Sequence, residues 1–152
     1  MSATTTDNDV AGFTIAETNG STSVDESGTT DTFTVVLNAQ PIENVVLSIA
    51  SGTVSESTVT PDSITFTTAN WDTPQTITST GVDDAGIIDG SQISQVTVSI
   101  VQEASDDLFD TVANQIVSVT TTDDDVPGFT VTESAGSTQV DESGTTDTFT
   151  VV

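Results

Sequence analysis

The sequence predicts an all-β fold, a seven-stranded β-sandwich with Greek-key connections. Runs rich in Thr, Val, Ile and Phe alternate apolar and polar residues, which places every second side chain on one face of a strand. Clusters of Gly, Pro, Asn, Asp and Ser separate these runs. No window combines a helical period with helix caps, and several short strands separated by turn signals are typical of a sandwich.

Each expected strand follows from its own alternating run. The strands cover residues 12–17, 31–38, 44–50, 62–68, 74–81, 93–101 and 115–122. The side chains expected to face inward in the clearest runs are Phe33, Val35 and Leu37, then Val45, Leu47 and Ile49, then Ile64 and Phe66, and then Val96, Val98 and Ile100. Trp71, the single tryptophan, lies in a turn between two strands, and we interpret it as a plug at one end of the core.

The chain also contains an internal repeat. Residues 120–152 repeat residues 4–36 at an offset of 116 positions, and only seven of the 33 aligned residues differ. A unit of this length is the size of one small β domain. We therefore expect a complete sandwich repeat at 4–122, an acidic interdomain linker at 123–127 and the first strands of a next, truncated repeat at 128–152.

The truncated repeat holds two expected strands, 128–133 and 146–152, that cannot bury an apolar face alone. Their inward candidates are Phe129, Val131, Phe149 and Val151. Three outcomes stay open for this tail: it displaces its own N-terminal copy, it packs on another copy of the chain, head to tail, or it frays.

The charge of the chain is one-sided. It contains 24 Asp and Glu residues and no Lys, Arg or His, which gives a net charge of −24. Every carboxylate must therefore be solvated, protonated, hydrogen-bonded or matched by a bound cation. A solubilising acidic surface explains scattered carboxylates equally well, but clustered ones repel by up to about 4 kcal/mol per close pair at an effective dielectric near 20.

The same composition excludes several classes of function. Nucleic acids and anionic membranes are bound through Lys and Arg, and no apolar run reaches the length of a membrane span. Nucleophilic triads and most acid–base sites need His, Cys or Lys, so we expect that the protein is not an enzyme. Paired carboxylates could hydrolyse a glycoside, but one Trp and six Phe offer few platforms for a sugar.

Eight carboxylates fall in segments that can meet at one end of the sandwich. They are Glu26, Glu56, Asp83, Asp84, Asp89, Asp123, Asp124 and Asp125. In an extended segment Asp123 and Asp125 project to one side and Asp124 to the other. An all-oxygen site selects a hard cation, and Ca²⁺ accepts about six to eight oxygens in flexible geometry, whereas Mg²⁺ is stricter. The sequence therefore predicts a Ca²⁺ site at the joint between repeats.

A second acidic group is expected at the opposite end of the sandwich. Its members are Asp7, Asp9, Asp106, Asp107 and Asp110. This group either completes the metal site of a preceding domain or is a solvated loop that Leu108 and Phe109 anchor to the core.

The unit resembles a Calx-β domain, an immunoglobulin-like sandwich repeat found in sodium–calcium exchangers, integrin β4 and large bacterial surface proteins. The resemblance rests on the start Glu26-Ser27-Gly28-Thr29, the loop from Val82 to Asp89 and the junction from Asp123 to Phe129, and it spans essentially the whole repeat. It extends to the tandem repeats of secreted bacterial adhesins and RTX-type proteins. The resemblance implies that the eight carboxylates, with a loop carbonyl near Gly86, hold Ca²⁺.

Two departures from the Calx-β pattern are visible. The loop after Asp84 is one residue longer, which could displace Asp89. Gln92 stands where an exchanger-type domain carries a further acid, which argues for fewer or weaker ions.

Together these features predict a calcium-stiffened structural repeat of an extracellular bacterial adhesin or surface filament. Its expected partners are neighbouring repeats or other copies, with contact to a glycan or host surface through other domains. The alternative is a β-sandwich module that binds a glycan or a protein with its face or loops. An exposed aromatic or groove-forming cluster would favour that alternative.

Overall fold

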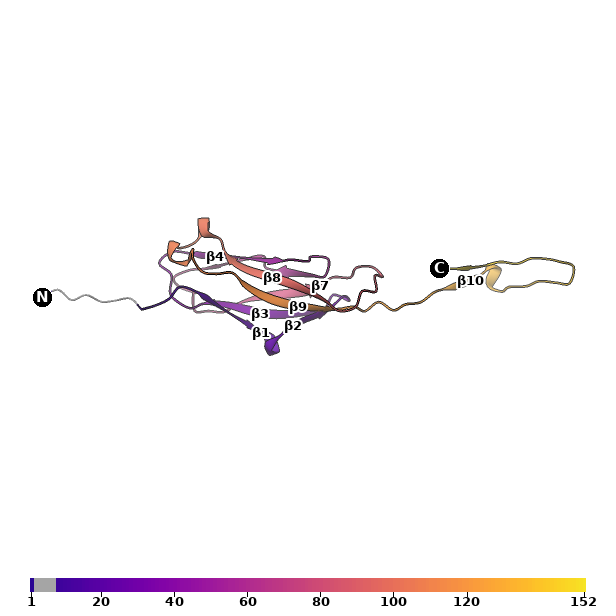
Figure 1. Ribbon diagram of the computed structural model, residues 1–152, viewed down its shortest axis with the longest axis horizontal. Coiled ribbons are helices and arrows are strands. Elements are labelled where there is room, and N and C mark those ends of the chain that lie inside the picture. The colour runs from indigo at the N-terminus through magenta and orange to yellow at the C-terminus, as the bar shows by residue number, and fades with distance from the viewer. Residues whose placement is uncertain (2–7) are drawn as a thin grey trace.

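The computed structural model describes Met1 and residues 8–152. Within this part of the chain, sheets of four and five strands pack face to face, and the predicted β-sandwich is confirmed (Figure 1). The four-stranded sheet contains, in order, β1 (Phe13–Glu17), β3 (Thr30–Leu37), β7 (Gln75–Gly81) and β5 (Ser57–Thr60). The five-stranded sheet contains, in order, β2 (Thr22–Asp25), β9 (Gln115–Thr122), β8 (Gln92–Ile100), β4 (Val45–Ser51) and β6 (Ser63–Phe66). Neighbouring strands are antiparallel except β2 and β9, which are parallel.

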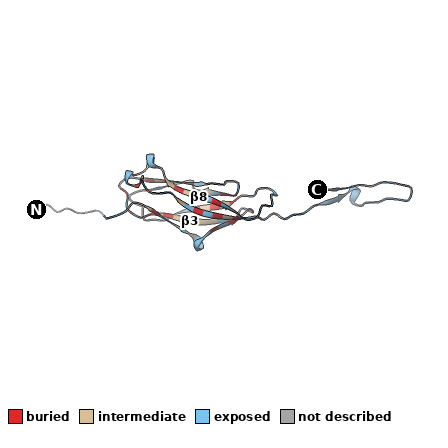
Figure 2. Cartoon of the chain, in the orientation of Figure 1, coloured by how far each residue is buried: buried red, intermediate tan, exposed pale blue. Residues whose placement is uncertain are grey.

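The core lies between the two sheets. Every inward residue predicted from the alternation is buried except Ile100, which is partly buried and packs against the same cluster. Figure 2 shows the buried positions along the strands of the sandwich. Burial of one such Val, Leu, Ile or Phe side chain contributes about 1.5–3 kcal/mol. Trp71 is partly buried against this core, and its carbonyl oxygen accepts the Leu37 N–H at 3.2 Å.

Two strands of the sandwich were not expected from the sequence. β2 contributes one apolar side chain to the core, Val24, and its pairing partner is the distant strand β9. β5 likewise has a single apolar residue, Val59, and pairs with β7. Strands this short carry too little alternation to be recognised, because the partner strand and not the local sequence makes them extended.

Strand direction decides which loops meet at each end. β2, β7 and β9 end where β5 and β8 begin, as the pairs Asp25↔Thr122, Ser57↔Gly81 and Gln92↔Thr121 show. We call this the linker end, because residues 123–127 leave the sandwich there (Figure 1). The opposite end, where β1 starts, is the entrance end.

Gly81 allows the two sheets to close at the linker end. A Cβ atom on Gly81 would lie 2.0 Å from the backbone oxygen of Asp25, a distance that no side chain tolerates. Its own N–H donates to the carbonyl oxygen of Thr29 at 3.0 Å. The end of β7 therefore lies directly against the turn that follows β2.

The helical segments are short 3-10 turns. They are η1 (Thr18–Gly20), η2 (Gln102–Ala104), η3 (Asp107–Phe109) and η4 (Ser134–Gly136). None of the helices in the described residues is long and apolar enough to cross a membrane.

The tail forms a separate hairpin beyond the linker end. β10 (Val131–Glu133) pairs antiparallel with β11 (Phe149–Val151) in a two-stranded sheet of their own. The apolar side chains expected to face inward are exposed, among them Phe129 at 76% and Phe149 at 58%. In Figure 1 this hairpin continues along the long axis of the sandwich.

Candidate metal centre

Acidic side chains from four segments meet at the linker end. Glu26 follows β2, and Glu56 immediately precedes β5. Asp84 and Asp89 belong to the loop between β7 and β8, and Asp125 to the linker after β9. Carboxylate oxygens of Glu26, Asp84 and Asp125 lie within 4.8 Å of one another, and so do those of Glu56, Asp84 and Asp89. Asp84 is common to both groups, so the two groups form one continuous acidic centre.

The deepest member of the centre is Glu26. Its side chain is 1% exposed, and both of its carboxylate oxygens are buried without a hydrogen-bond partner. Three further buried carboxylate oxygens lack a partner in the same place: Oε2 of Glu56, Oδ1 of Asp84 and Oδ2 of Asp125. Buried polar atoms are almost always satisfied, and an unpaired buried charge is costly. The orphaned oxygens therefore indicate a ligand that binds between them.

Local hydrogen bonds hold Glu26 in this position. Oδ1 of Asp25 accepts the Ser27 N–H at 3.0 Å, and the Asp25 N–H donates to Oγ1 of Thr29 at 2.7 Å. The Glu26 N–H donates to the carbonyl oxygen of Thr122 at 3.1 Å. The hydroxyl and then the N–H of Ser27 lower the pKa of Asp25. Asp25 thus serves the turn, and Glu26 is left to project into the interior.

The backbone of Glu56 is anchored just as firmly. Its carbonyl oxygen accepts the Val82 N–H at 3.0 Å and the hydroxyl of the buried Thr121 at 3.2 Å. The start of β5 is therefore tied to the end of β7 and to β9, which brings the Glu56 side chain beside Asp84 and Asp89.

Asp123 connects the linker to the loop between β7 and β8. Its Oδ2 accepts the Gly90 N–H at 2.9 Å, and its Oδ1 accepts the Asp125 N–H at 2.8 Å. These backbone bonds lower the pKa of Asp123. Asp123 is thus held as a carboxylate at the edge of the centre and orients Asp125 toward Glu26.

The electrostatics of the centre are unfavourable without a cation. Burial, together with the carboxylates of Asp84, Asp123, Asp89 and Glu56, raises the pKa of Glu26 from 4.5 to about 7. Burial and the neighbouring Asp89 also raise the pKa of Asp84. Since the chain has no Lys, Arg or His, only a proton or a bound cation can relieve this repulsion.

The eight predicted carboxylates divide into three sets. The structure brings Glu26, Glu56, Asp84, Asp89 and Asp125 together, with Asp123 at their edge. Asp83 and Asp124 are exposed and belong to neither group. Oδ1 of Asp83 accepts the Ala85 N–H at 2.7 Å and shapes the loop.

Two positions that support the centre were not recognised from the sequence. Gly81 matters through a backbone approach that only three-dimensional structure reveals. Asp25 carries a readable signal, because an Asp two residues before a Ser is typical of a side-chain-capped turn. Gln92 donates from Nε2 to the carbonyl oxygen of Asp89 at 3.2 Å, and so braces the loop that carries Asp89.

The acidic group at the entrance end has a different structure. Burial alone would raise the pKa of Asp106, but the N–H groups of Leu108, Ile42 and Glu43 outweigh it and lower that pKa. These bonds measure 3.0, 2.7 and 3.1 Å. Asp106 is therefore a capping residue that joins two loops.

The other members of this second group do not form a metal-type cluster among the described residues. Asp9 and Asp107 are exposed, and Asp110 is half-buried with one orphaned oxygen, Oδ1. Asp7 lies outside the described residues.

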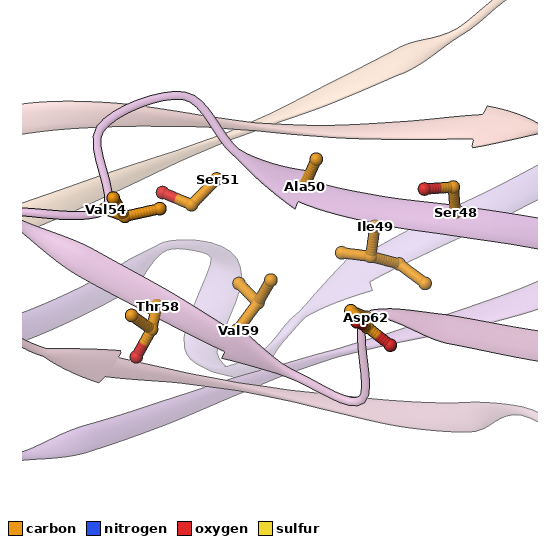
Figure 3. Close-up of a pocket in the computed structure, with 8 residues that line it drawn as sticks. All are labelled: Ser48, Ile49, Ala50, Ser51, Val54, Thr58, Val59 and Asp62. Carbon is orange, nitrogen blue, oxygen red and sulfur yellow. The ribbon is translucent and has the colours of Figure 1, made fainter.

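A shallow groove of about 390 Å³ lies between β4 and β5, at one edge of the sandwich. Figure 3 shows its lining, which consists of small and aliphatic side chains such as Ala50, Ser51 and Val54, together with Asp62. No aromatic residue lines it, so it offers no stacking surface for a sugar ring.

Comparisons with known proteins define the fold. No protein-family model matches the sequence, Calx-β included, and no curated protein matches it. The E. coli chaperone DraB superposes with a TM-score of 0.53 at 9% identity, over 79% of this chain and 59% of that one. The YadV chaperone gives a TM-score of 0.53 at 12% identity, over 80% and 60% of the two chains. A PapD-like domain of human CEP192 gives 0.49 at 8% identity, over 84% and 94%.

The chain is thus similar in fold to the two chaperones, as an immunoglobulin-like β-sandwich. It spans only 59% and 60% of the length of the two chaperones. At this low identity the likeness concerns the fold alone.

Proposed function

We propose that this chain is a calcium-binding structural repeat of an extracellular adhesin or surface filament. In this proposal the centre at the linker end binds Ca²⁺, and the ion fixes the direction in which the next repeat leaves. The observation that carries the proposal is Glu26, a fully buried carboxylate with two unpartnered oxygens among further acids, in a chain without cationic side chains.

The donor set favours Ca²⁺ over other cations. It consists of carboxylates alone, without His or Cys, and this chemistry selects hard cations. The donors come from four separate segments of the chain, which suits the flexible coordination of Ca²⁺ better than the strict octahedron of Mg²⁺. Because Asp84 belongs to both groups, it would bridge two ions if both sites were filled.

The position of the centre explains why an ion there would act on the joint. Asp123 and Asp125 belong to the linker, whereas Glu26, Asp84 and Asp89 belong to the sandwich. An ion that binds both sets ties the linker to the sandwich. The chain has no cysteine and therefore no disulfide, so a bound metal is the cross-link available to stabilise a long extracellular array.

A calorimetric titration with Ca²⁺ tests the proposal, and the repeat supplies a matched control. Glu142 occupies the position of Glu26 in the second copy, with the same flanking turn, but it is exposed. We expect Glu26→Gln to lose at least one ion and Glu142→Gln to bind like the unchanged chain. A Mg²⁺ titration in parallel is expected to give weaker binding.

Thermal unfolding gives an independent measure. A ligand that binds only the folded state at a hundredfold excess over Kd stabilises by about 2.7 kcal/mol per site. We therefore expect a clear rise of Tm in millimolar Ca²⁺ over EDTA. Equal melting temperatures at matched ionic strength would reject the proposed function.

The effect on the joint is tested by amide hydrogen exchange in residues 123–128. We expect Ca²⁺ to slow exchange there in the unchanged chain and to have little effect in the double variant Asp123→Asn, Asp125→Asn. Asp124→Asn is the control, because Asp124 is exposed and belongs to neither group. If the double variant and the control respond alike to Ca²⁺, the ion does not stiffen the linker.

A further inference from the structure

The two ends of the sandwich both present apolar side chains to solvent. At the linker end, the loop between β7 and β8 exposes Ile87 and Ile88, at 57% and 53%. Two adjacent exposed isoleucines are unusual in a loop that, after Val82, otherwise consists of Asp, Gly, Ala and Ser. Asp84 and Asp89 of the same loop belong to the acidic centre, but the isoleucine side chains offer no ligand atom to it.

At the entrance end there is a groove of about 360 Å³. Its lining includes Ala39 and Phe109, which are buried, and Val10 and Leu108, which are 78% and 63% exposed. The groove therefore has an apolar floor, and its rim combines Val10, Ala11 and Leu108 with the polar residues Asp9, Gln40 and Thr111. The sandwich carries two exposed isoleucines at one end and a depression with an apolar floor at the other.

We infer that successive sandwiches dock end to end, with Ile87 and Ile88 of one sandwich seated in the entrance groove of the next. The occupant is thus a second copy of the same fold. This inference deepens the proposed function and rests on it, because it names the contact that an array of these repeats would make at each joint.

The chain itself indicates which copy is the neighbour. Residues 128–152 begin a second copy, and Val126 and Pro127 occupy the positions of the groove residues Val10 and Ala11. A linker of residues 123–127 spans at most about 18 Å when fully extended. In Figure 1 the hairpin that begins the second copy lies beyond the linker end and continues along the long axis of the sandwich.

Hydrogen bonds restrict the joint further. Asp123 accepts the N–H of Gly90, which lies two residues after Ile88 in the same loop. The start of the linker is therefore tied to the loop that carries the isoleucines. A second sandwich that begins directly after this linker has its entrance end within reach of Ile87 and Ile88.

Charge makes this docking dependent on Ca²⁺. Both faces are acidic, because Asp84 and Asp89 belong to the loop at the linker end and Asp9 lines the groove. Without a cation these groups repel at short range. With Ca²⁺ bound, the charge at the linker end is reduced and the apolar contact can form.

Disulfide trapping in a chain with two complete sandwiches tests the contact. Adding residues 37–122 after Val152 completes the second copy, and each sandwich then has the full core described above. The chain contains no cysteine, so an introduced pair reports one contact. The test pair is Ile88→Cys in the first copy and Leu108→Cys in the second.

The control pair combines Ile88→Cys with Ile93→Cys of the second copy. Ile93 is exposed to the same degree as Leu108, at 65%, but it lies at the start of β8, at the far end of the second sandwich. With saturating Ca²⁺ we expect the test pair to cross-link about tenfold faster than the control and than the same test pair in EDTA, where the tether is the same and only the Ca²⁺-dependent contact is missing. Equal rates of the two pairs in saturating Ca²⁺ would overturn the docking.

A second measurement avoids cysteine. The double variant Ile87→Ser, Ile88→Ser is expected to broaden the interdomain distances seen by small-angle scattering with Ca²⁺, whereas Ile93→Ser leaves them unchanged. An unchanged envelope in the double variant would also overturn the inference. Ca²⁺ binding is measured separately on both chains by calorimetry, so loss of docking with intact binding is distinguished from failure of the proposed calcium site.

Discussion

Residues 12–36 and 128–152 are near-copies in sequence, yet one segment builds a sandwich and the other forms an exposed hairpin. Phe33 is completely buried, and its counterpart Phe149 is 58% exposed. Glu26 is 1% exposed, and its counterpart Glu142 is exposed. Nothing in the local sequence accounts for these differences. The differences in burial are due to the remaining strands of the first copy, which cover Phe33 and Glu26.

Some features are the same in both segments and are therefore local. Ile15 pairs with Val35 in the first copy, and Val131 pairs with Val151 in the second, which is the same hairpin register. The capped turn also recurs: the Asp141 N–H donates to Oγ1 of Thr145 at 2.9 Å, as that of Asp25 does to Thr29. Short-range sequence suffices for a register and for a turn.

Other features exist only in the complete sandwich. β2 is a strand because β9 lies beside it, and the equivalent residues 138–141 have no partner strand and are not extended into a sheet. The acidic centre likewise needs segments from the whole sandwich. Phe149 and Glu142 are exposed in the second copy for the same reason: the strands that cover Phe33 and Glu26 in the first copy are missing there.

The largest expected difference between the copies concerns the core. Phe33→Ala should destabilise the sandwich by about 3–5 kcal/mol, because it removes a fully buried ring and leaves a cavity. Phe149→Ala should change the same transition by less than about 0.5 kcal/mol. Urea unfolding, followed by the fluorescence of Trp71, gives both values. Similar losses in the two variants would mean that the tail is part of the sandwich's cooperative unit.

The next prediction concerns the close contact between Gly81 and the turn that follows β2. Gly81→Ala places a methyl group against the Asp25 carbonyl oxygen, and we expect it to cost at least about 1–3 kcal/mol. It should also weaken Ca²⁺ binding, because the turn carries Glu26. Gly128→Ala is the control, since a Cβ there meets nothing within 4 Å. Calorimetry of both variants checks this, and unchanged Ca²⁺ affinity in Gly81→Ala would show that the closure does not position Glu26.

These comparisons explain how much could be predicted from the sequence. Alternation identified the long strands and their inward residues, because Phe33, Val35 and Leu37 report their own environment through a period of two. The same logic failed for β2 and β5, whose extension depends on distant partners. For the site, chain order and strand direction were enough to expect carboxylates at one end. They could not tell that Asp83 turns back to the Ala85 N–H while Asp84 joins both acidic groups.

The third prediction concerns the calcium-free sandwich and pH. The pKa of Glu26 is raised to about 7 in the folded state from 4.5, so the folded protein binds a proton that the unfolded chain releases. The free energy of unfolding without Ca²⁺ should therefore rise as pH falls from about 7 toward 4.5. The contribution of Glu26 protonation is lost again as pH rises through that window. Asp25 and Asp123 have lowered pKa values and act in the opposite direction only below this window.

Denaturant midpoints in calcium-free buffer between about pH 5 and pH 8 measure this effect. Glu26→Gln should flatten the rise, because an amide cannot titrate, and Glu142→Gln should keep it. Adding Ca²⁺ should reverse the slope, since protons then compete with the ion for Glu26. A midpoint that is flat with pH in the calcium-free wild-type chain would contradict the proton account.

The smallest expected effect concerns a position where the two copies differ in sequence. Asn19 and its counterpart Ala135 both adopt the left-handed conformation, with φ of 56° and 52°. Asn tolerates this region better than Ala, because its short polar side chain can bond to the local backbone. Asn19→Ala should therefore destabilise the sandwich by about 0.5–1 kcal/mol. Ala135→Asn should leave the sandwich unchanged and increase the hairpin population in the tail, which amide exchange at residues 131–133 and 149–151 would report. If Asn19→Ala costs nothing, the surrounding strands and not the residue determine this turn, and the turn belongs with β2 among the features that only the complete sandwich imposes.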